Sequence, residues 1–301
     1  MEKYDLVIIG TGPAGYAASV YASRYKVNHV VIGAMPGGTA SSAHRICNFP
    51  GYEEIPGLEL MMKMRQQMLS YGTKEVMDRV VGISKEGNDF VVNTEKSGSY
   101  RSSSVLVAVG TKRRKLGLKE EKKYEGKGLS YCVTCDGMFY KDKEIAVVGG
   151  SDAANMATVY LSDIVKKVYV IYRGQKLRGE QLWIDEVMKA KNVEIIFNAN
   201  VVELLGESSL EGVRLDKDNM KLDVGGVFVE IGSDPSLDFE LDIDLNEAGY
   251  IVVDKAQKTS LDGIYAAGDI TTNSNGFQQV VTACSEGAIA INSIYYCLKK
   301  L

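Results

Sequence analysis

Two cysteines, Cys132 and Cys135, are separated by two residues in the middle of the chain, and Asp136 follows the second one directly. Two thiols at this spacing can give up two electrons and close into a disulfide. The exchange needs a group that takes and returns a proton, and the aspartate stands where it can do so. An aspartate before a glycine is also typical of a turn or a helix cap. The residue types therefore predict a redox-active dithiol with an acid–base neighbour.

Zinc binding and simple burial are the alternatives for these two cysteines. A structural zinc ion needs four ligands, usually completed by a second pair of cysteines or histidines. The chain has only two histidines, which are not paired, and its other cysteines, at positions 47, 284 and 297, show no ligand spacing. Those three cysteines are interpreted as small core residues.

The composition excludes several classes of protein. A length of 301 residues suggests one large or two ordinary domains. The net charge of −4 and the pI of about 5.5 lack the basic surface that a nucleic acid or an anionic membrane requires. Charged residues follow the first methionine, and no apolar run approaches the length of a membrane span. We therefore expect a cytoplasmic protein with neither a membrane nor a nucleic-acid partner.

A glycine cluster near the start of the chain predicts a nucleotide-binding unit, with a strand, a helix and a second strand at residues 4–9, 14–23 and 29–32. Gly10 makes the tight turn, Gly12 lets the backbone approach a pyrophosphate, and Gly15 lets the helix and strand close up. The phosphates would face the start of the helix. The acidic residue that usually ends the second strand is missing, because Gly33 stands there.

The same pattern recurs in the second half, with a strand, a helix and a strand at residues 144–148, 155–162 and 167–171. Here the middle glycine position of the turn is Ser151, whose Cβ keeps the backbone away from a pyrophosphate. Arg173 and Arg178 follow the second strand, where a cation suits the 2′-phosphate of NADPH. Both arginines are alternatively ordinary solvated side chains. The charged stretch 110–121 and the stretch 232–238 are the candidate linkers between two α/β domains.

A third candidate lies near the end of the chain, where an apolar run at residues 264–267 ends in Gly268 and Asp269. One interpretation is a strand that ends in a simple turn. The other is that Asp269 accepts hydrogen bonds from the polyol chain of a flavin.

Taken together, these motifs resemble low-molecular-weight thioredoxin reductase over nearly the whole chain. The matching stretches are residues 10–15, 37–38, 48–51, 132–137 and 265–269, together with Gly110 and Gln279. The resemblance implies an α/β fold of two Rossmann-like domains, the second inserted into the first, and a homodimer. The split FAD-binding domain would comprise residues 1–113 and 245–301, and the nucleotide and dithiol domain residues 114–244.

The resemblance also implies roles for individual residues. Cys135 would lie nearer the flavin, Cys132 would attack the substrate, and Asp136 would be the acid–base group. The residues expected to bind FAD are Gly10, Gly12, Pro13, Ala14, Gly15, Gly37, Gly38, Thr39, Asn48, Val80, Gly110, Gly268, Asp269, Gln279 and Val280. The residues expected at the second nucleotide site are Gly149, Ser151, Asp152, Ala153, Arg173 and Arg178.

The implied function is a flavoenzyme that passes two electrons through FAD to the Cys132–Cys135 disulfide and on to a thioredoxin-like protein. The donor is expected to be NADPH or, because the nucleotide motif is eroded, reduced ferredoxin or a deazaflavin. The erosion includes Ser151 and Gly174, where the family has a glycine and an arginine. An FAD-dependent dithiol oxidase that uses O2 is the alternative enzyme, and a redox sensor without catalytic turnover is the alternative of another class.

Overall fold

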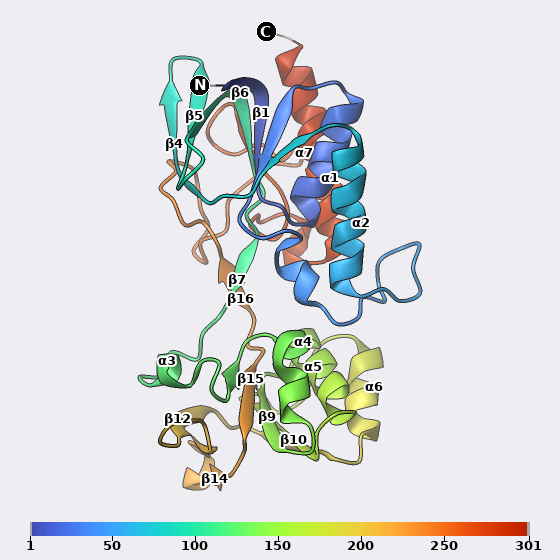
Figure 1. Cartoon of the computed structure of the whole chain (residues 1–301), viewed down its shortest axis with the longest axis vertical. Helices are drawn as coiled ribbons and strands as arrows, with labels where there is room; N and C mark the ends of the chain where they lie inside the picture. The colour runs from blue at the N-terminus through green and yellow to red at the C-terminus, as the bar shows by residue number, and fades with distance from the viewer. Residues whose placement is uncertain (1, 300–301) are drawn as a thin grey trace. The chain divides into compact units, whose positions relative to one another are not determined.

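The structure is a computed structural model that describes residues 2–299 (Figure 1). The chain separates into two compact units, each described here by itself. Unit 1 comprises Met1–Lys112 and Asp234–Leu301, and unit 2 comprises Arg113–Ser233. Two short strands, β7 (Thr111–Arg113) and β16 (Ser233–Pro235), contain the two chain crossings and pair with each other.

Unit 1 is built on a seven-stranded sheet with the order β3-β2-β1-β6-β5-β4, in which β17 also pairs with β6. Its strands are β1 (Glu2–Ile9), β2 (His29–Ile32), β3 (Lys74–Val76), β4 (Val80–Glu86), β5 (Asp89–Thr94), β6 (Ser99–Val107) and β17 (Ile264–Ala266). The strands β3, β2, β1, β6 and β17 pair in parallel, whereas β4, β5 and β6 form an antiparallel meander. The parallel strands carry the predicted βαβ unit.

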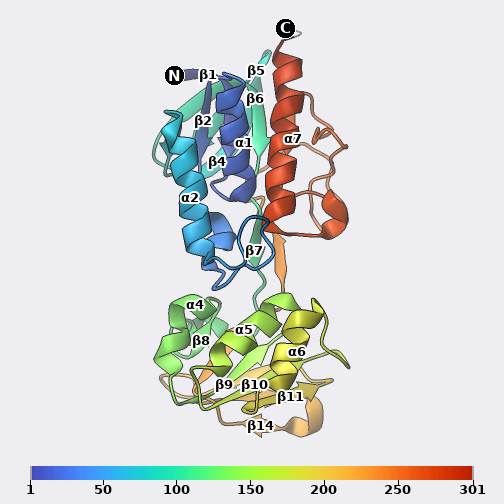
Figure 2. The same ribbon diagram turned by 90° about the vertical axis from the view of Figure 1, so that its right-hand side faces the viewer.

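Helices cover one face of this sheet, and irregular chain covers the other (Figures 1 and 2). The helical elements of unit 1 are α1 (Pro13–Arg24), η1 (Gly38–Ser42), α2 (Gly57–Ser70), η4 (Ser274–Gly276) and α7 (Val280–Leu298). Side chains of β1 alternate, so that Leu6 and Ile8 pack against the helices while Val7 and Ile9 pack into the cluster on the opposite face. This alternation is why every strand position from Leu6 to Ile9 is apolar.

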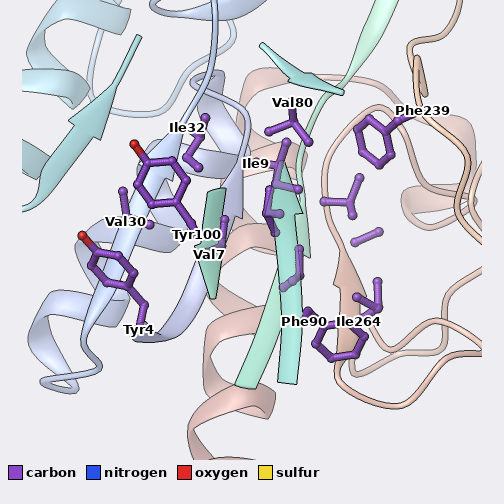
Figure 3. Close-up of a cluster of buried hydrophobic side chains, with 14 of the residues drawn as sticks. Tyr4, Val7, Ile9, Val30, Ile32, Val80, Phe90, Tyr100, Phe239 and Ile264 are labelled. Carbon is purple, nitrogen blue, oxygen red and sulfur yellow. The ribbon is translucent and has the colours of Figure 1, made fainter. Parts of the chain in front are cut away.

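The cluster on the non-helical face corrects the expected second domain boundary. Phe239 is buried there among sheet side chains, as Figure 3 shows, and the partly buried Leu237, Leu241 and Ile243 pack against the same cluster. The chain therefore rejoins unit 1 at Asp234, about ten residues before the boundary placed at 244/245. The alternating apolar residues of this segment bury against the sheet without forming a strand.

Unit 2 has a parallel sheet of order β11-β10-β9-β15-β8 and an antiparallel sheet of β12, β13 and β14. Its strands are β8 (Leu129–Ser130), β9 (Glu144–Val148), β10 (Lys167–Tyr172), β11 (Val193–Phe197), β12 (Val201–Leu205), β13 (Gly212–Leu215), β14 (Lys221–Leu222) and β15 (Gly226–Val229). Its helical elements are α3 (Glu121–Tyr124), α4 (Val133–Asp136), η2 (Gly137–Tyr140), α5 (Asp152–Ser162), α6 (Gln181–Lys189) and η3 (Lys217–Asn219).

The two faces of the parallel sheet in unit 2 bury different partners. Ile145 and Val147 of β9 pack with α5 and α6, whereas Ala146 and Val148 pack with β12 and β13. The expected α/β fold with an inserted second Rossmann-like domain is confirmed. In the part of the chain that the structure describes, no helix combines the length and apolar character that crossing a bilayer needs.

Candidate functional site

The first glycine turn of unit 1 contains two glycines that the packing requires and one that faces open space. A Cβ on Gly10, where φ is +127°, would lie 2.1 Å from the carbonyl oxygen of Ala108, and one on Gly15 would lie 1.9 Å from that of Gly10. A Cβ on Gly12 would meet no atom within 4 Å. Because Gly12 is the N-cap of α1, followed by Pro13 and Ala14, the open space lies at a helix N-terminus. This arrangement suits a pyrophosphate.

A second turn lies beside this one. The Gly37 N–H donates to the carbonyl oxygen of Thr11 over 2.7 Å. A Cβ on Gly38 would stand 3.3 Å from Gly12 Cα. The structure therefore brings the predicted Gly37–Gly38 turn against the predicted phosphate loop.

The same contacts explain the missing acidic residue at the end of β2. A Cβ on Gly33 would lie 2.5 Å from Thr11 Oγ1, which donates to the carbonyl oxygen of Met35 over 2.7 Å. Position 33 thus has no room for a carboxylate, and Thr11 takes the space.

Two of the predicted flavin-binding side chains meet although they are far apart in sequence. Asn48 Nδ2 donates to Gln279 Oε1 over 3.0 Å. Gln279 is the N-cap of α7 and forms a reciprocal capping box with Thr282, and Val280 is the first residue of the helix. The contact fixes Asn48 beside a second helix N-terminus in the same unit.

Asp269 is a partly buried carboxylate, and no hydrogen-bond donor within residues 2–299 reaches its side chain. Burial, and next the charge of Glu286, raise its pKa to about 6. A hydroxyl that donates a hydrogen bond to this carboxylate would stabilise it, and the polyol chain of a flavin carries such hydroxyls. The structure therefore supports the flavin interpretation of Asp269 over that of a simple turn.

Glu286 is a residue beside this site that the sequence analysis did not single out. Its buried carboxylate accepts hydrogen bonds from the Gly268 N–H at 2.8 Å, from Thr271 Oγ1 at 2.9 Å and from Ser274 Oγ at 2.5 Å. It thereby fixes the turn that presents Asp269. A signal was available, because Glu286 falls in the buried stripe of α7 together with Ala283, Gly287 and Ala290.

The remaining residues predicted to contact the flavin are Val80, Gly110 and Thr39. Val80 begins β4, and its side chain is buried in the apolar cluster with Phe239. Gly110 has a φ of +65° and accepts a hydrogen bond from the Ser236 N–H. Thr39 is exposed on η1.

Cys132 and Cys135 form a disulfide in unit 2, with their Cα atoms 5.3 Å apart. Cys132 is the N-cap of α4, and Cys135 and Asp136 are its last two residues. Cys132 is partly buried, whereas Cys135 is exposed. Within residues 2–299, no group of three or more His, Cys, Asp or Glu side chains is arranged to hold a metal ion. The disulfide favours the redox interpretation of the cysteine pair over the zinc interpretation.

Ser130, which the sequence analysis did not single out, connects the dithiol to the aspartate. Its buried hydroxyl donates to Asp136 Oδ2 over 2.6 Å and accepts the Cys132 N–H over 3.0 Å. The side chain of Asp136 is thus held against the turn that carries the first cysteine.

The nucleotide turn of unit 2 carries two Cβ atoms that the turn of unit 1 lacks, on Ser151 in place of Gly12 and on Ala154 in place of Gly15. Ser151 is the N-cap of α5 with φ −118° and ψ −174°, and Gly12 is the N-cap of α1 with φ −87° and ψ −172°. Both residues are extended, so their Cβ positions are equivalent. The space that stays open at Gly12 is therefore taken at Ser151 by the serine's own Cβ.

The chain that follows β10 is hydrogen-bonded to this turn. Arg178 N–H donates to the carbonyl oxygen of Gly150, Asn155 Nδ2 donates to that of Arg178, and Glu180 N–H donates to Asp152 Oδ1, all at 2.7–2.8 Å. One carboxylate oxygen of Asp152 therefore already accepts a backbone hydrogen bond. Of the other predicted residues, Gly149 has a φ of +141°, and Ala153, Arg173 and Arg178 are exposed.

A ring fills the space at two further positions of this site. Tyr172 stands between Gly150 and Gly174, where added Cβ atoms would lie 2.4 Å and 2.6 Å from it. An arginine at position 174 would therefore displace Tyr172. The Tyr172 ring needs the space that a side chain at position 174 would take, so Gly174 and Tyr172 depend on each other.

Comparison with known proteins identifies the family. The family described as pyridine nucleotide-disulphide oxidoreductase matches residues 4–287. A thioredoxin reductase from Borreliella burgdorferi is 38% identical over 295 residues, covering 95% of this chain and 89% of that protein. The crystal structure of Lactococcus lactis thioredoxin reductase has a TM-score of 0.95 at 32% identity and covers 99% of this chain and 100% of that one. A ferredoxin-flavin thioredoxin reductase from Clostridium acetobutylicum has a TM-score of 0.56 at 30% identity and covers 100% of both chains.

The chain belongs to the pyridine nucleotide-disulphide oxidoreductase family. Within this family it is an enzyme similar to thioredoxin reductases along nearly its whole length. FAD, the cofactor of such enzymes, fits the residues of unit 1, because Gly12 leaves room for a pyrophosphate and Asp269 offers a carboxylate to which no residue from 2 to 299 donates a hydrogen bond.

Replacing the glycines of the first turn should separate ligand binding from packing. Gly12→Ala should leave the stability of the FAD-free protein unchanged and weaken FAD binding by tenfold or more, because the new methyl occupies only the ligand's space. Gly15→Ala should lower the free energy of unfolding by about 1–3 kcal/mol, because its methyl meets backbone. Thermal unfolding without FAD and FAD titration check both. Normal FAD affinity in Gly12→Ala would contradict the pyrophosphate assignment.

The raised pKa of Asp269 predicts a pH-dependent stability. A carboxyl with a pKa near 6 when folded and near 3.8 when unfolded stabilises the fold below about pH 4 and loses that contribution as the pH rises through about 6. Asp269→Asn should therefore gain stability relative to the wild type between pH 5 and pH 7 in the FAD-free protein. Urea unfolding at both pH values measures this difference, and an unchanged difference would show that Asp269 has no unusual titration.

Proposed function

We propose that the chain reduces the disulfide of a thioredoxin-like protein with electrons that reach Cys132 and Cys135 through FAD. The observation that carries this proposal is the disulfide beside an aspartate that Ser130 holds in place. FAD, when bound, supplies a reservoir of two electrons. It is unit 1 that offers the residues for holding it, and unit 2 that contains the dithiol.

The dithiol performs the exchange in two steps. Two electrons and two protons open the Cys132–Cys135 disulfide to two thiols. The Cys132 thiolate then attacks the partner's disulfide, so that a mixed disulfide forms and one partner sulfur leaves. Cys135 attacks the mixed disulfide, which restores the protein's own disulfide and releases the partner as a dithiol. Thr134 Oγ1, 3.5 Å from Cys132 Sγ, is a donor that can stabilise the attacking thiolate.

Asp136 is the proposed acid–base group of this exchange. It takes a proton when a thiol becomes a thiolate and returns it to the sulfur that leaves. Its position one residue after Cys135, in the same short helix, keeps it beside the cysteine pair through both steps.

For the electron donor, we propose a reduced ferredoxin or a reduced deazaflavin in preference to NADPH. Two features of unit 2 support this choice: the Cβ of Ser151 and the Tyr172 ring at Gly150 and Gly174. Each takes room at the nucleotide turn. The similarity to a ferredoxin-flavin thioredoxin reductase agrees with such a donor. Arg173 and Arg178 are exposed cations and suit an acidic donor protein as well as a phosphate.

Cys135→Ser should bind FAD normally and lose disulfide reduction, because no second thiol can resolve the mixed disulfide. Cys297→Ser is the matched control, since Cys297 lies in α7 of unit 1. The measurement is turnover of an oxidised bacterial thioredoxin with a chemically reduced flavin as donor. Multiple turnovers by Cys135→Ser would refute the proposed function.

Anaerobic bleaching of the flavin should distinguish the donors. NADPH, NADH, reduced ferredoxin and reduced deazaflavin are offered in parallel, and we expect one of the last two to bleach the flavin at the lowest concentration. Ser151→Gly should lower the concentration of NADPH required, whereas Ser162→Ala in the same helix should not. Bleaching of the wild type by micromolar NADPH would overturn the donor proposal. Peroxide release on addition of a dithiol alone would favour the oxidase.

A further inference from the structure

The hydroxyl of Ser130 has two acceptors within reach and only one proton to give. Ser130 Oγ lies 2.6 Å from Asp136 Oδ2 and 3.2 Å from the carbonyl oxygen of Cys132. It also accepts the Cys132 N–H over 3.0 Å. A serine hydroxyl donates one hydrogen bond and accepts two, so one lone pair of Ser130 Oγ remains available.

These contacts satisfy both protonation states of Asp136 without moving a heavy atom. When Asp136 is a carboxylate, the Ser130 proton points at Oδ2, in the distance range of a charge-assisted hydrogen bond. When Asp136 carries a proton, it can donate to the free lone pair of Ser130 Oγ, and the Ser130 proton turns to the Cys132 carbonyl oxygen. That carbonyl already accepts the Asp136 N–H at 3.1 Å and keeps a second lone pair for Ser130.

We propose that Ser130 is a positioning residue that works as a hydroxyl rotor, keeping Asp136 hydrogen-bonded in both protonation states while the dithiol reacts. This inference rests on the proposed role of Asp136 in disulfide reduction. In that reaction the protein dithiol and the partner disulfide become a protein disulfide and a partner dithiol, so two electrons and two protons pass to the partner. Asp136 carries a proton from a protein thiol to a leaving partner sulfur, and Ser130 turns once in each direction.

The place of Ser130 in the fold suits this role. Ser130 is 3% exposed and ends β8, which pairs with β15 through Val227 and Phe228. Backbone pairing therefore fixes the position of its oxygen. Asp136 is half-buried, and without such a partner one of its two protonation states would lose this hydrogen bond.

Other titratable groups lie around Asp136 and must be considered in any pH measurement. Tyr140 follows on η2, and burial, together with the Asp136 charge, raises the pKa of this phenol above its usual value of 10, so that it stays protonated at neutral pH. Lys143 stands 5.4 Å from the centre of the Tyr140 ring, and the Tyr160 ring of α5 lies beside Gly137. The thiols of Cys132 and Cys135 titrate as well once the disulfide is open.

The test is the rate of a single exchange as a function of pH. The protein, loaded with FAD, is reduced anaerobically with stoichiometric dithionite, mixed with an oxidised bacterial thioredoxin, quenched with acid and alkylated to count the reduced thioredoxin. Ser130→Ala should lower the maximal rate about tenfold and move the pH at half-maximal rate by about one unit. Ser130→Thr, which keeps the hydroxyl, should restore both. Thr158→Val, which removes another buried hydroxyl of unit 2, should change neither.

A double variant tests whether Ser130 acts through Asp136. Asp136→Asn should remove the pH dependence that the aspartate contributes, and adding Ser130→Ala should then lower the rate by less than twofold. If Ser130→Ala does not fold, Ser130→Gly serves in the same comparison. An unchanged pH profile in the serine variant, or full additivity with Asp136→Asn, would overturn the rotor. Failure of the wild type to reduce thioredoxin at any pH would instead overturn the proposed function.

Discussion

The close approach of backbone to ligand at the start of a helix is the constraint on which this molecule depends. It is met by Gly12 in unit 1, where a side chain would have no protein neighbour and would occupy only the ligand's place. The same position in unit 2 is Ser151, in a similar extended conformation. The Cβ of Ser151 therefore takes space that stays open at Gly12, and this space suits a pyrophosphate.

Two aspartates in the chain show how the surroundings of a carboxylate assign its role. Among the residues that the structure describes, none donates a hydrogen bond to the Asp269 side chain, which lies near the charge of Glu286 and can therefore accept hydrogen bonds from a ligand. Asp136 has an internal donor in Ser130, which in our proposal keeps it hydrogen-bonded in both protonation states. A buried group without a hydrogen bond costs more free energy than a hydrogen bond that is present contributes to stability. Asp269 therefore suits binding a donor from a ligand, and Asp136 suits proton transfer.

The local features of this structure were predictable from sequence, and the features that depend on distant contacts were not. Strands β2 and β9 were placed at their observed bounds, since short β-branched runs before glycine turns are clear signals. The turn glycines and the CxxC spacing are also local, which is why the cysteine pair was identified before its disulfide was seen. Ser130 lies two residues before Cys132, yet only the fold brings its oxygen to Asp136.

Residues 234–244 show a pattern that is visible in the sequence but whose structure the sequence did not predict. Their Leu, Phe and Ile side chains are spaced two apart, as in a strand, but they bury against the unit 1 sheet as irregular chain. A spacing argument identifies the buried side chains without identifying the surface that covers them. The domain boundary at 244/245 was placed too late, whereas the candidate linker 232–238 contains the observed crossing between Ser233 and Asp234.

In unit 2, the residues that depart from the family's nucleotide motif and the residues around the dithiol lie on different elements. Changes at Ser151, Tyr172 and Gly174 all affect the turn after β9 and the chain after β10, where a nucleotide would bring electrons in. The dithiol, Asp136 and Ser130 lie on β8 and α4, where electrons leave. A chain that had lost its activity would have no physical reason to keep a buried hydroxyl aligned on Asp136 while its nucleotide turn closed. The intact dithiol site and the narrowed nucleotide turn fit the proposed function, in which electrons pass through the dithiol and their source is not a nucleotide bound at this turn.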